Sequence, residues 1–136
     1  MATGHLPPLG PGRPWRTNIY SVHPVGGGDG GAVVTARDVE RFLRAVQQGG
    51  VWRGVAPADL LTPRVRAGGA WSVGYGVEIR DDGVFGKDGG DPGVFAVALR
   101  RPADGTTLVV LANVDEEAVP GLPDLTRSLV GAVLGR

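Results

Sequence analysis

The sequence predicts an α+β fold: an antiparallel sheet of about three to four strands, with a helix before it and a C-terminal helix packed on it. Apolar residues recur at helical spacing near the start of this region and again at its end. Between them lie segments with strand-like patterns, and their connections are too short for parallel crossovers. The length of 136 residues fits one domain spanning residues 1–136.

Residues 1–31 form a Gly/Pro-rich segment without helical or strand periodicity, so we expect an extended stretch that lies against a core formed by residues 32–136. The glycine run within residues 26–31 is not a phosphate-binding loop, because no Gly-Lys-Ser/Thr follows it. This segment is predicted to contribute contacts rather than regular structure.

The first predicted helix begins at Thr35, with Asp38 as its capping-box partner, and ends at the glycine pair 49–50. Its apolar positions follow helical spacing: Val39, Phe42, Leu43 and Val46. Residues 56–61 are interpreted as a short second helix that Pro63 stops.

Four strands are predicted after the second helix. Residues 72–80 alternate between apolar and polar or small positions, and an Asp-Asp-Gly turn at 81–83 leads into a strand over 84–87. Residues 94–99 and 107–112 are continuous apolar runs, predicted to be buried strands joined by a turn at 101–105. Leu125, Leu129 and Val133, four residues apart, are expected to form the apolar face of the closing helix.

Composition excludes several classes of function. Fourteen basic and 14 acidic residues give no net charge, which argues against nucleic acid or a membrane as partner. The absence of cysteine excludes disulfides, thiolate chemistry and cysteine-ligated metals. His5 and His23 have no metal-ligand spacing, so neither a metal nor another cofactor is expected. No signal-peptide pattern is visible, which favours the cytoplasm while leaving localisation open.

Residues 86–93 (Gly-Lys-Asp-Gly-Gly-Asp-Pro-Gly) concentrate glycine, one cation and two carboxylates between two predicted strands. They hold Lys87, the single lysine among 14 basic residues. On composition alone the segment is an irregular hairpin loop. The functional alternative is a loop whose backbone passes close to a ligand.

A resemblance that spans nearly the whole chain favours the functional alternative. The segments that carry it are residues 26–31, 35–38, 61–64, 74–77, 86–93 and 108–113. In this order they resemble the C-terminal part of serine β-lactamase-related proteins, which include penicillin-binding-protein-type peptidases and esterases. The resemblance implies a partial β-lactamase-like fold and hydrolysis of an acyl ester or amide.

Family members use Ser-x-x-Lys, Tyr-x-Asn, and Lys-Thr-Gly or His-x-Gly motifs. Lys87-Asp88-Gly89 resembles the third motif. The resemblance implies that Lys87 faces a substrate carboxylate or joins the proton network, and that the Gly90 N–H is half of an oxyanion hole. Asp88 departs from the usual small residue and would repel an anionic substrate such as a penicillin. Gly89, Asp91 and Tyr75 are the implied substrate-binding residues.

The other two motifs are absent, since no Ser is followed by Lys at the required spacing and neither Tyr is followed by Asn. We therefore expect no independent activity by the family's mechanism, and a partner chain or a homo-oligomer that replaces the missing N-terminal part. Two alternatives stay open: a non-catalytic binding or self-associating derivative, and an enzyme that uses Lys87, Asp88 or His23 for other acid–base chemistry.

Overall fold

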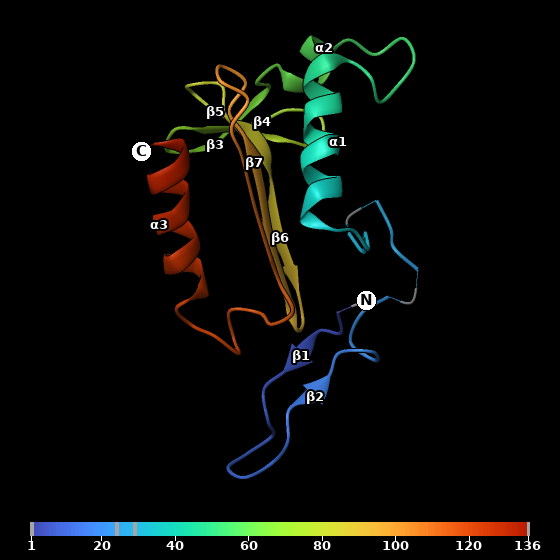
Figure 1. Ribbon diagram of the computed structural model, residues 1–136, viewed down its shortest axis with the longest axis vertical. Coiled ribbons are helices and arrows are strands. Elements are labelled where there is room, and N and C mark those ends of the chain that lie inside the picture. The colour runs from blue at the N-terminus through green and yellow to red at the C-terminus, as the bar shows by residue number, and fades with distance from the viewer. Residues whose placement is uncertain (1, 24, 29, 136) are drawn as a thin grey trace.

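The computed structural model describes residues 2–23, 25–28 and 30–135, so Met1, Pro24 and Asp29 of the predicted extended segment lie outside the described residues. The elements are β1 (His5–Leu6), β2 (Arg16–Thr17), α1 (Ala36–Gln48), α2 (Pro57–Leu61), β3 (Val65–Gly68), β4 (Trp71–Val73), β5 (Glu78–Arg80), β6 (Phe85–Asp91), β7 (Val94–Arg100), β8 (Thr107–Ala112) and α3 (Leu122–Leu134) (Figure 1). None of the described helices is both long and apolar enough to cross a membrane.

The main sheet has six antiparallel strands in the order β3-β4-β5-β6-β7-β8. The predicted α+β class is confirmed, with helices before and after an antiparallel sheet. The sheet has more strands than expected, because three short strands, β3 to β5, extend it beyond the long hairpins of β6, β7 and β8.

The single strand predicted over residues 72–80 is wrong. β4 and β5 form a hairpin instead, closed where the Gly74 N–H donates to the Val77 carbonyl at 2.8 Å. Gly76 has a φ of 73°, in the left-handed region that glycine adopts without steric cost. Alternation of apolar residues continues through the turn in the sequence, although the chain reverses there.

Residues 86–93 are not the irregular loop that composition predicts. Residues 86–91 continue β6 in register with β7, from Gly86 opposite Leu99 to Asp91 opposite Val94, and only Pro92 and Gly93 form the turn. Glycine suits this strand because a Cβ at Gly86 would lie 1.9 Å from the Ala98 carbonyl oxygen. The close approach of two backbones therefore explains part of the glycine content.

α1 and α3 lie on opposite sides of the long strands (Figure 1). On the α1 side, Leu43 and Val46 pack with Ile79 and Phe85. On the α3 side, Leu134 packs in a second cluster with Val84, Val97 and Leu99. Burial of apolar area stabilises a fold by about 25 cal/mol per Å², so these two clusters stabilise the packing of the helices on the sheet.

The first helix confirms its predicted start. Thr35 accepts a hydrogen bond from the Asp38 N–H at 3.2 Å, and the Asp38 carboxylate accepts from the Thr35 N–H, also at 3.2 Å. Phe42, expected in the apolar stripe, is 49% exposed and contacts Trp52 edge to face, with ring centroids 6.2 Å apart.

α3 turns a different stripe to the sheet from the predicted one. Leu125 is 57% and Val133 38% exposed, whereas Leu134 is 1% exposed. The residues that pack toward the sheet are Leu122, Thr126, Val130 and Leu134. The prediction failed because the helix carries two adjacent apolar stripes, and periodicity alone does not choose between them.

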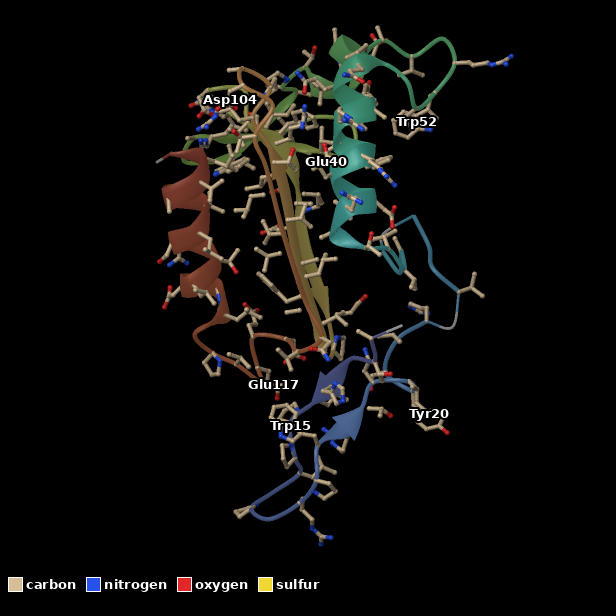
Figure 2. The ribbon with its side chains drawn as sticks, viewed as in Figure 1. Trp15, Tyr20, Glu40, Trp52, Asp104 and Glu117 are labelled. Atoms are coloured by element: carbon tan, nitrogen blue, oxygen red, sulfur yellow. The ribbon has the colours of Figure 1, made fainter. Side chains whose placement is uncertain are left out.

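The N-terminal segment forms a small hairpin, β1–β2, that projects from one end of the molecule (Figure 1). Its base is tied to the β6–β7 turn, where the His5 N–H donates to the Gly93 carbonyl (3.2 Å) and Asn18 Nδ2 donates to the Pro92 carbonyl (3.0 Å). The His5 N–H also donates to the carbonyl of Asn113 (2.8 Å), directly after β8. Figure 2 shows Trp15 beside β2 and Tyr20 in the segment that follows β2, both away from the main sheet.

Candidate functional site

The part of β6 that carries the candidate residues has a free edge. β5 pairs with β6 only at Gly86 and Phe85. The Arg80 N–H donates to the Val84 carbonyl at 2.7 Å, so the main-chain groups of Val84 point toward β5. In an antiparallel strand every second residue bonds to the same neighbour, so the main-chain groups of Gly86, Asp88 and Gly90 point to the same side as those of Val84. It follows that Asp88 and Gly90 direct their N–H and C=O groups away from β7, past the end of β5.

Lys87 lies on the α1 side of β6, on the same face as Phe85. Its ammonium forms an ion pair with Glu78 and lies 3.4 Å from Asp88 Oδ1. Burial alone would lower the pKa of Lys87, but the hydrogen bond and charge of Glu78, with a smaller effect of Asp88, raise it. Lys87 is therefore a cation at neutral pH and does not act as a proton acceptor there.

Glu78 is a site residue that sequence reasoning missed. The Asp-Asp-Gly turn sets the register of the β5–β6 hairpin and places Glu78 opposite Gly86, next to Lys87. Counting outward from that turn gives this pairing, so a signal was present in the sequence. Splitting residues 72–80 into two strands was the step needed to use it.

The remaining predicted residues of the motif continue along β6. Asp88 is exposed and lies opposite Val97 in the register of β6 and β7, and its carboxylate is 3.4 Å from the Lys87 ammonium. Gly89 has open space where a Cβ would be, and a Cβ at Gly90 would lie 3.1 Å from the Val94 carbonyl. Asp91 ends the strand.

Tyr75 lies in the β4–β5 turn rather than on a strand. The Arg64 guanidinium carbon lies 4.2 Å from the centre of its ring, a cation–π contact. The ring is 60% exposed, and in the described part of the chain no hydrogen bond joins it to Lys87 or Glu78. The structure thus brings Lys87, Asp88 and Glu78 together and leaves Tyr75 with Arg64.

None of the three serines, Ser21, Ser72 and Ser128, is followed three residues later by lysine. Ser72 is buried in β4, and Ser128 Oγ donates to the Asp124 carbonyl on α3 at 2.8 Å. Within residues 2–23, 25–28 and 30–135, no group of three or more His, Cys, Asp or Glu side chains is placed to hold a metal ion. What the β6 edge offers is one ammonium, nearby carboxylates and outward backbone N–H groups.

Comparison with known proteins decides the family. The sequence model of the beta-lactamase family matches residues 1–132. The chain belongs to the beta-lactamase family. Comparison with curated proteins gives no match.

Among solved structures, this beta-lactamase family chain is similar to a penicillin binding protein from Bacillus halodurans. The two are 31% identical in sequence, with a TM-score of 0.76. The match covers 93% of this chain but only 40% of the other. The chain therefore corresponds to less than half of that protein, and the α+β fold described above is part of a beta-lactamase-like fold.

Proposed function

We propose that this chain acts as the C-terminal portion of a beta-lactamase-related serine hydrolase, whose nucleophilic serine comes from outside these 136 residues. The observation that carries the proposal is the position of Lys87-Asp88-Gly89 on β6, directly before an outward-facing Gly90 N–H on a free strand edge. Backbone N–H groups held by a sheet are suited to stabilise the charge that develops on a carbonyl oxygen.

In the proposed reaction, the serine oxygen attacks the carbonyl carbon of an ester or amide, and the Gly90 N–H donates to the resulting oxyanion. The serine proton passes to the alcohol or amine, which leaves as the carbonyl re-forms and gives an acyl-enzyme. Water then hydrolyses this ester, releasing the acid and returning a proton to the serine. Lys87 contributes a positive charge that Glu78 positions. Gly89, Asp91 and Tyr75 are proposed to contact the substrate.

The charges along this edge favour an uncharged or cationic substrate. Glu78 already balances Lys87, and both Asp88 and Asp91 are further carboxylates on the same strand end. An anionic substrate would have to displace Glu78 to reach the ammonium, which would break the Lys87–Glu78 ion pair. The same arrangement disfavours penicillin-like carboxylates.

The experiment combines this chain with the part of the Bacillus halodurans protein that has no counterpart here, which the family pattern expects to carry Ser-x-x-Lys. A fluorophosphonate probe should label that serine only when both pieces are present. Gly90→Pro, which removes the outward N–H, and Lys87→Ala should reduce labelling, roughly tenfold or more for one lost oxyanion donor. Gly121→Ala, before α3 and away from β6, is the matched control, because a Cβ there also meets open space.

Two results would contradict the proposal: no labelling of the mixture with the unmodified chain, or equal labelling with Gly90→Pro. The chain alone is expected to hydrolyse p-nitrophenyl esters no faster than buffer, since none of its serines is followed by lysine at the motif's spacing. Turnover by the chain alone that Lys87→Ala abolishes would instead favour acid–base chemistry built on Lys87.

A further inference from the structure

Pro92 and Gly93 form the two-residue turn that joins β6 to β7, directly after the end of the candidate site. Asp91 pairs with Val94 across this turn. Proline fixes φ at about −65°, and Gly93 has a φ of 79°, a combination that identifies a type II turn. Two-residue hairpins favour types I′ and II′, whose twist matches that of the strands, whereas a type II turn splays them. The end of this hairpin therefore needs support from outside it.

Three hydrogen bonds supply this support. Asn18 Nδ2 donates to the Pro92 carbonyl at 3.0 Å. The His5 N–H donates to the Gly93 carbonyl at 3.2 Å, and the Gly93 N–H donates to Asp115 Oδ2 at 2.7 Å. Figure 1 shows the N-terminal hairpin at this end of the long strands. Segments far apart in the sequence thus converge on one turn of two residues.

The Asn18 side chain is built into this contact. It is 6% exposed. A Cβ at Gly4 would lie 2.2 Å from Asn18 Nδ2, and a Cβ at Gly93 would lie 3.1 Å from Asn18 Cβ. The side chain is therefore enclosed between two glycines that leave room for it. Its amide has the Pro92 carbonyl as acceptor, and every atom of the contact belongs to this chain.

Strand register extends the effect of this contact to Gly90. Asp91 pairs with Val94 next to the turn, and its main-chain groups point toward β7. Gly89 pairs with Ala96 in the same way, so Gly90 lies between two hydrogen-bonded pairs. If the turn splays, these two pairs separate first, and the direction of the Gly90 N–H is no longer fixed. An oxyanion donor depends on a direction that is fixed before the reaction.

We propose that Asn18 is a positioning residue for the hydrolase reaction. By holding the Pro92 carbonyl, Asn18 keeps the β6–β7 turn closed and so fixes the outward direction of the Gly90 N–H. The inference rests on the proposed function, because the Gly90 N–H acts as an oxyanion donor only beside a nucleophilic serine. It adds to that function a residue from the N-terminal hairpin, outside the main sheet.

The alternative is a role of Asn18 confined to the hairpin. The Asn18 N–H donates to the Gly4 carbonyl at 3.1 Å, and the Ser21 N–H donates to the Asn18 carbonyl at 2.8 Å. These two bonds use main-chain groups, which every variant at this position keeps. The bond to the turn uses the side-chain amide. Replacing the side chain therefore separates the two roles.

Hydrogen exchange tests the effect on the turn. In Asn18→Ala the Val94 and Ala96 amides should exchange roughly tenfold faster than in the unmodified chain, as expected for the loss of one hydrogen bond. The Ala98 amide, further from the turn, should be unchanged and reports intact folding. Asn18→Asp keeps the shape of the side chain but removes the donor, so it should have the same effect without leaving a cavity.

Labelling of the serine in the combined pieces tests the effect on the reaction. At saturating fluorophosphonate the labelling rate should fall roughly tenfold in Asn18→Ala, with the half-saturating probe concentration unchanged, because an oxyanion donor acts in the transition state. Arg16→Ala is the matched control, since Arg16 Nε donates to the Pro7 carbonyl at 3.2 Å within the same hairpin. This control should change neither the rate nor the half-saturating concentration.

A change of turn type provides a rescue. Pro92→Asn gives an Asn-Gly sequence, which favours the type I′ turn that matches the strand twist, and Gly93 already has the positive φ that this turn requires. In the double variant Asn18→Ala/Pro92→Asn, the labelling rate and the exchange of Val94 and Ala96 should return close to the values of the unmodified chain. A role confined to the hairpin predicts no such rescue.

The outcomes distinguish this inference from the proposed function. No labelling of the mixture that contains the unmodified chain would overturn both. Labelling of the mixture at the same rate with Asn18→Ala and with the unmodified chain would overturn this inference alone. A double variant that is labelled no faster than Asn18→Ala would also overturn it, because Asn18 would then act elsewhere than at the turn.

Discussion

Arg80 joins the middle of the sheet to the end of α3, and we predict that its replacement by methionine destabilises the protein strongly. The side chain is 9% exposed. It donates to the Leu134 carbonyl at 2.7 Å and to the Gly135 carbonyl at 2.9 Å, two groups at the end of α3 that have no partner within the helix. Asp82 holds the guanidinium through two further bonds, at 2.8 and 2.7 Å.

Each hydrogen bond from a charged donor contributes about 1.5–3 kcal/mol, and water replaces part of this at the exposed Gly135. Arg80→Met should therefore lower the free energy of unfolding by about 2–4 kcal/mol, with little from Asp82, which is half exposed. Urea denaturation followed by tryptophan fluorescence, at one fixed protein concentration, measures the change.

Arg101→Met is the matched control for this experiment. Arg101 forms a similar two-bond pair with Asp104, at 3.0 and 2.7 Å, but in the described part of the chain it donates to no helix end. Its replacement should cost much less. Equal losses for the two variants would refute the argument, because the carbonyls at the end of α3 would then contribute nothing measurable.

Three further predictions follow from contacts described above or nearby. Gly86→Ala should cost several kcal/mol or prevent folding, because its Cβ meets a backbone oxygen at 1.9 Å, whereas circular dichroism of Gly89→Ala on the same strand should be unchanged. Leu134→Ala should cost about 3 kcal/mol in urea denaturation and Leu125→Ala well under 1, and the reverse order would show that α3 is rotated. Hydrogen bonds from backbone N–H groups, chiefly that of Gly93, hold the pKa of Asp115 below its usual value, although burial opposes this shift. These hydrogen bonds to the carboxylate therefore stabilise the folded state above about pH 4 and are lost as the carboxylate is protonated at lower pH. The stability difference between the unmodified chain and Asp115→Asn should accordingly shrink from pH 7 to pH 3, and a constant difference would contradict this account.

Local signals in the sequence were sufficient for the first helix and for the two long strands β7 and β8, but they gave only the start of β6. The Thr35 cap and the apolar runs of β7 and β8 each depend on a few neighbouring residues, and the structure contains these elements. The errors occurred where tertiary contacts decide. A glycine turn divides residues 72–80, and the packing of the sheet selects Leu134 rather than Leu125 as a core residue of α3.

The candidate site shows the same division. The motif at Lys87 was visible as a sequence pattern, but its ion pair with Glu78 depends on the register of the β5–β6 hairpin. The outward direction of the Gly90 N–H also follows from strand register. It could not be predicted, because composition indicated a loop here, without hydrogen bonds between strands. Strand pairing is a long-range property, and a single sequence specifies it only through turns that are identified correctly.

The ties between the N-terminal hairpin and the β6–β7 turn constrain when the protein can finish folding during synthesis. His5 and Asn18 bond to Pro92, Gly93 and Asn113, which the ribosome adds roughly 75 to 110 residues later. Until then the segment that carries Trp15 and Tyr20 lacks these hydrogen bonds to the sheet. Cotranslational folding of this chain should thus proceed from the first helix through the sheet, with the earlier-made hairpin fixed only after β8 has emerged.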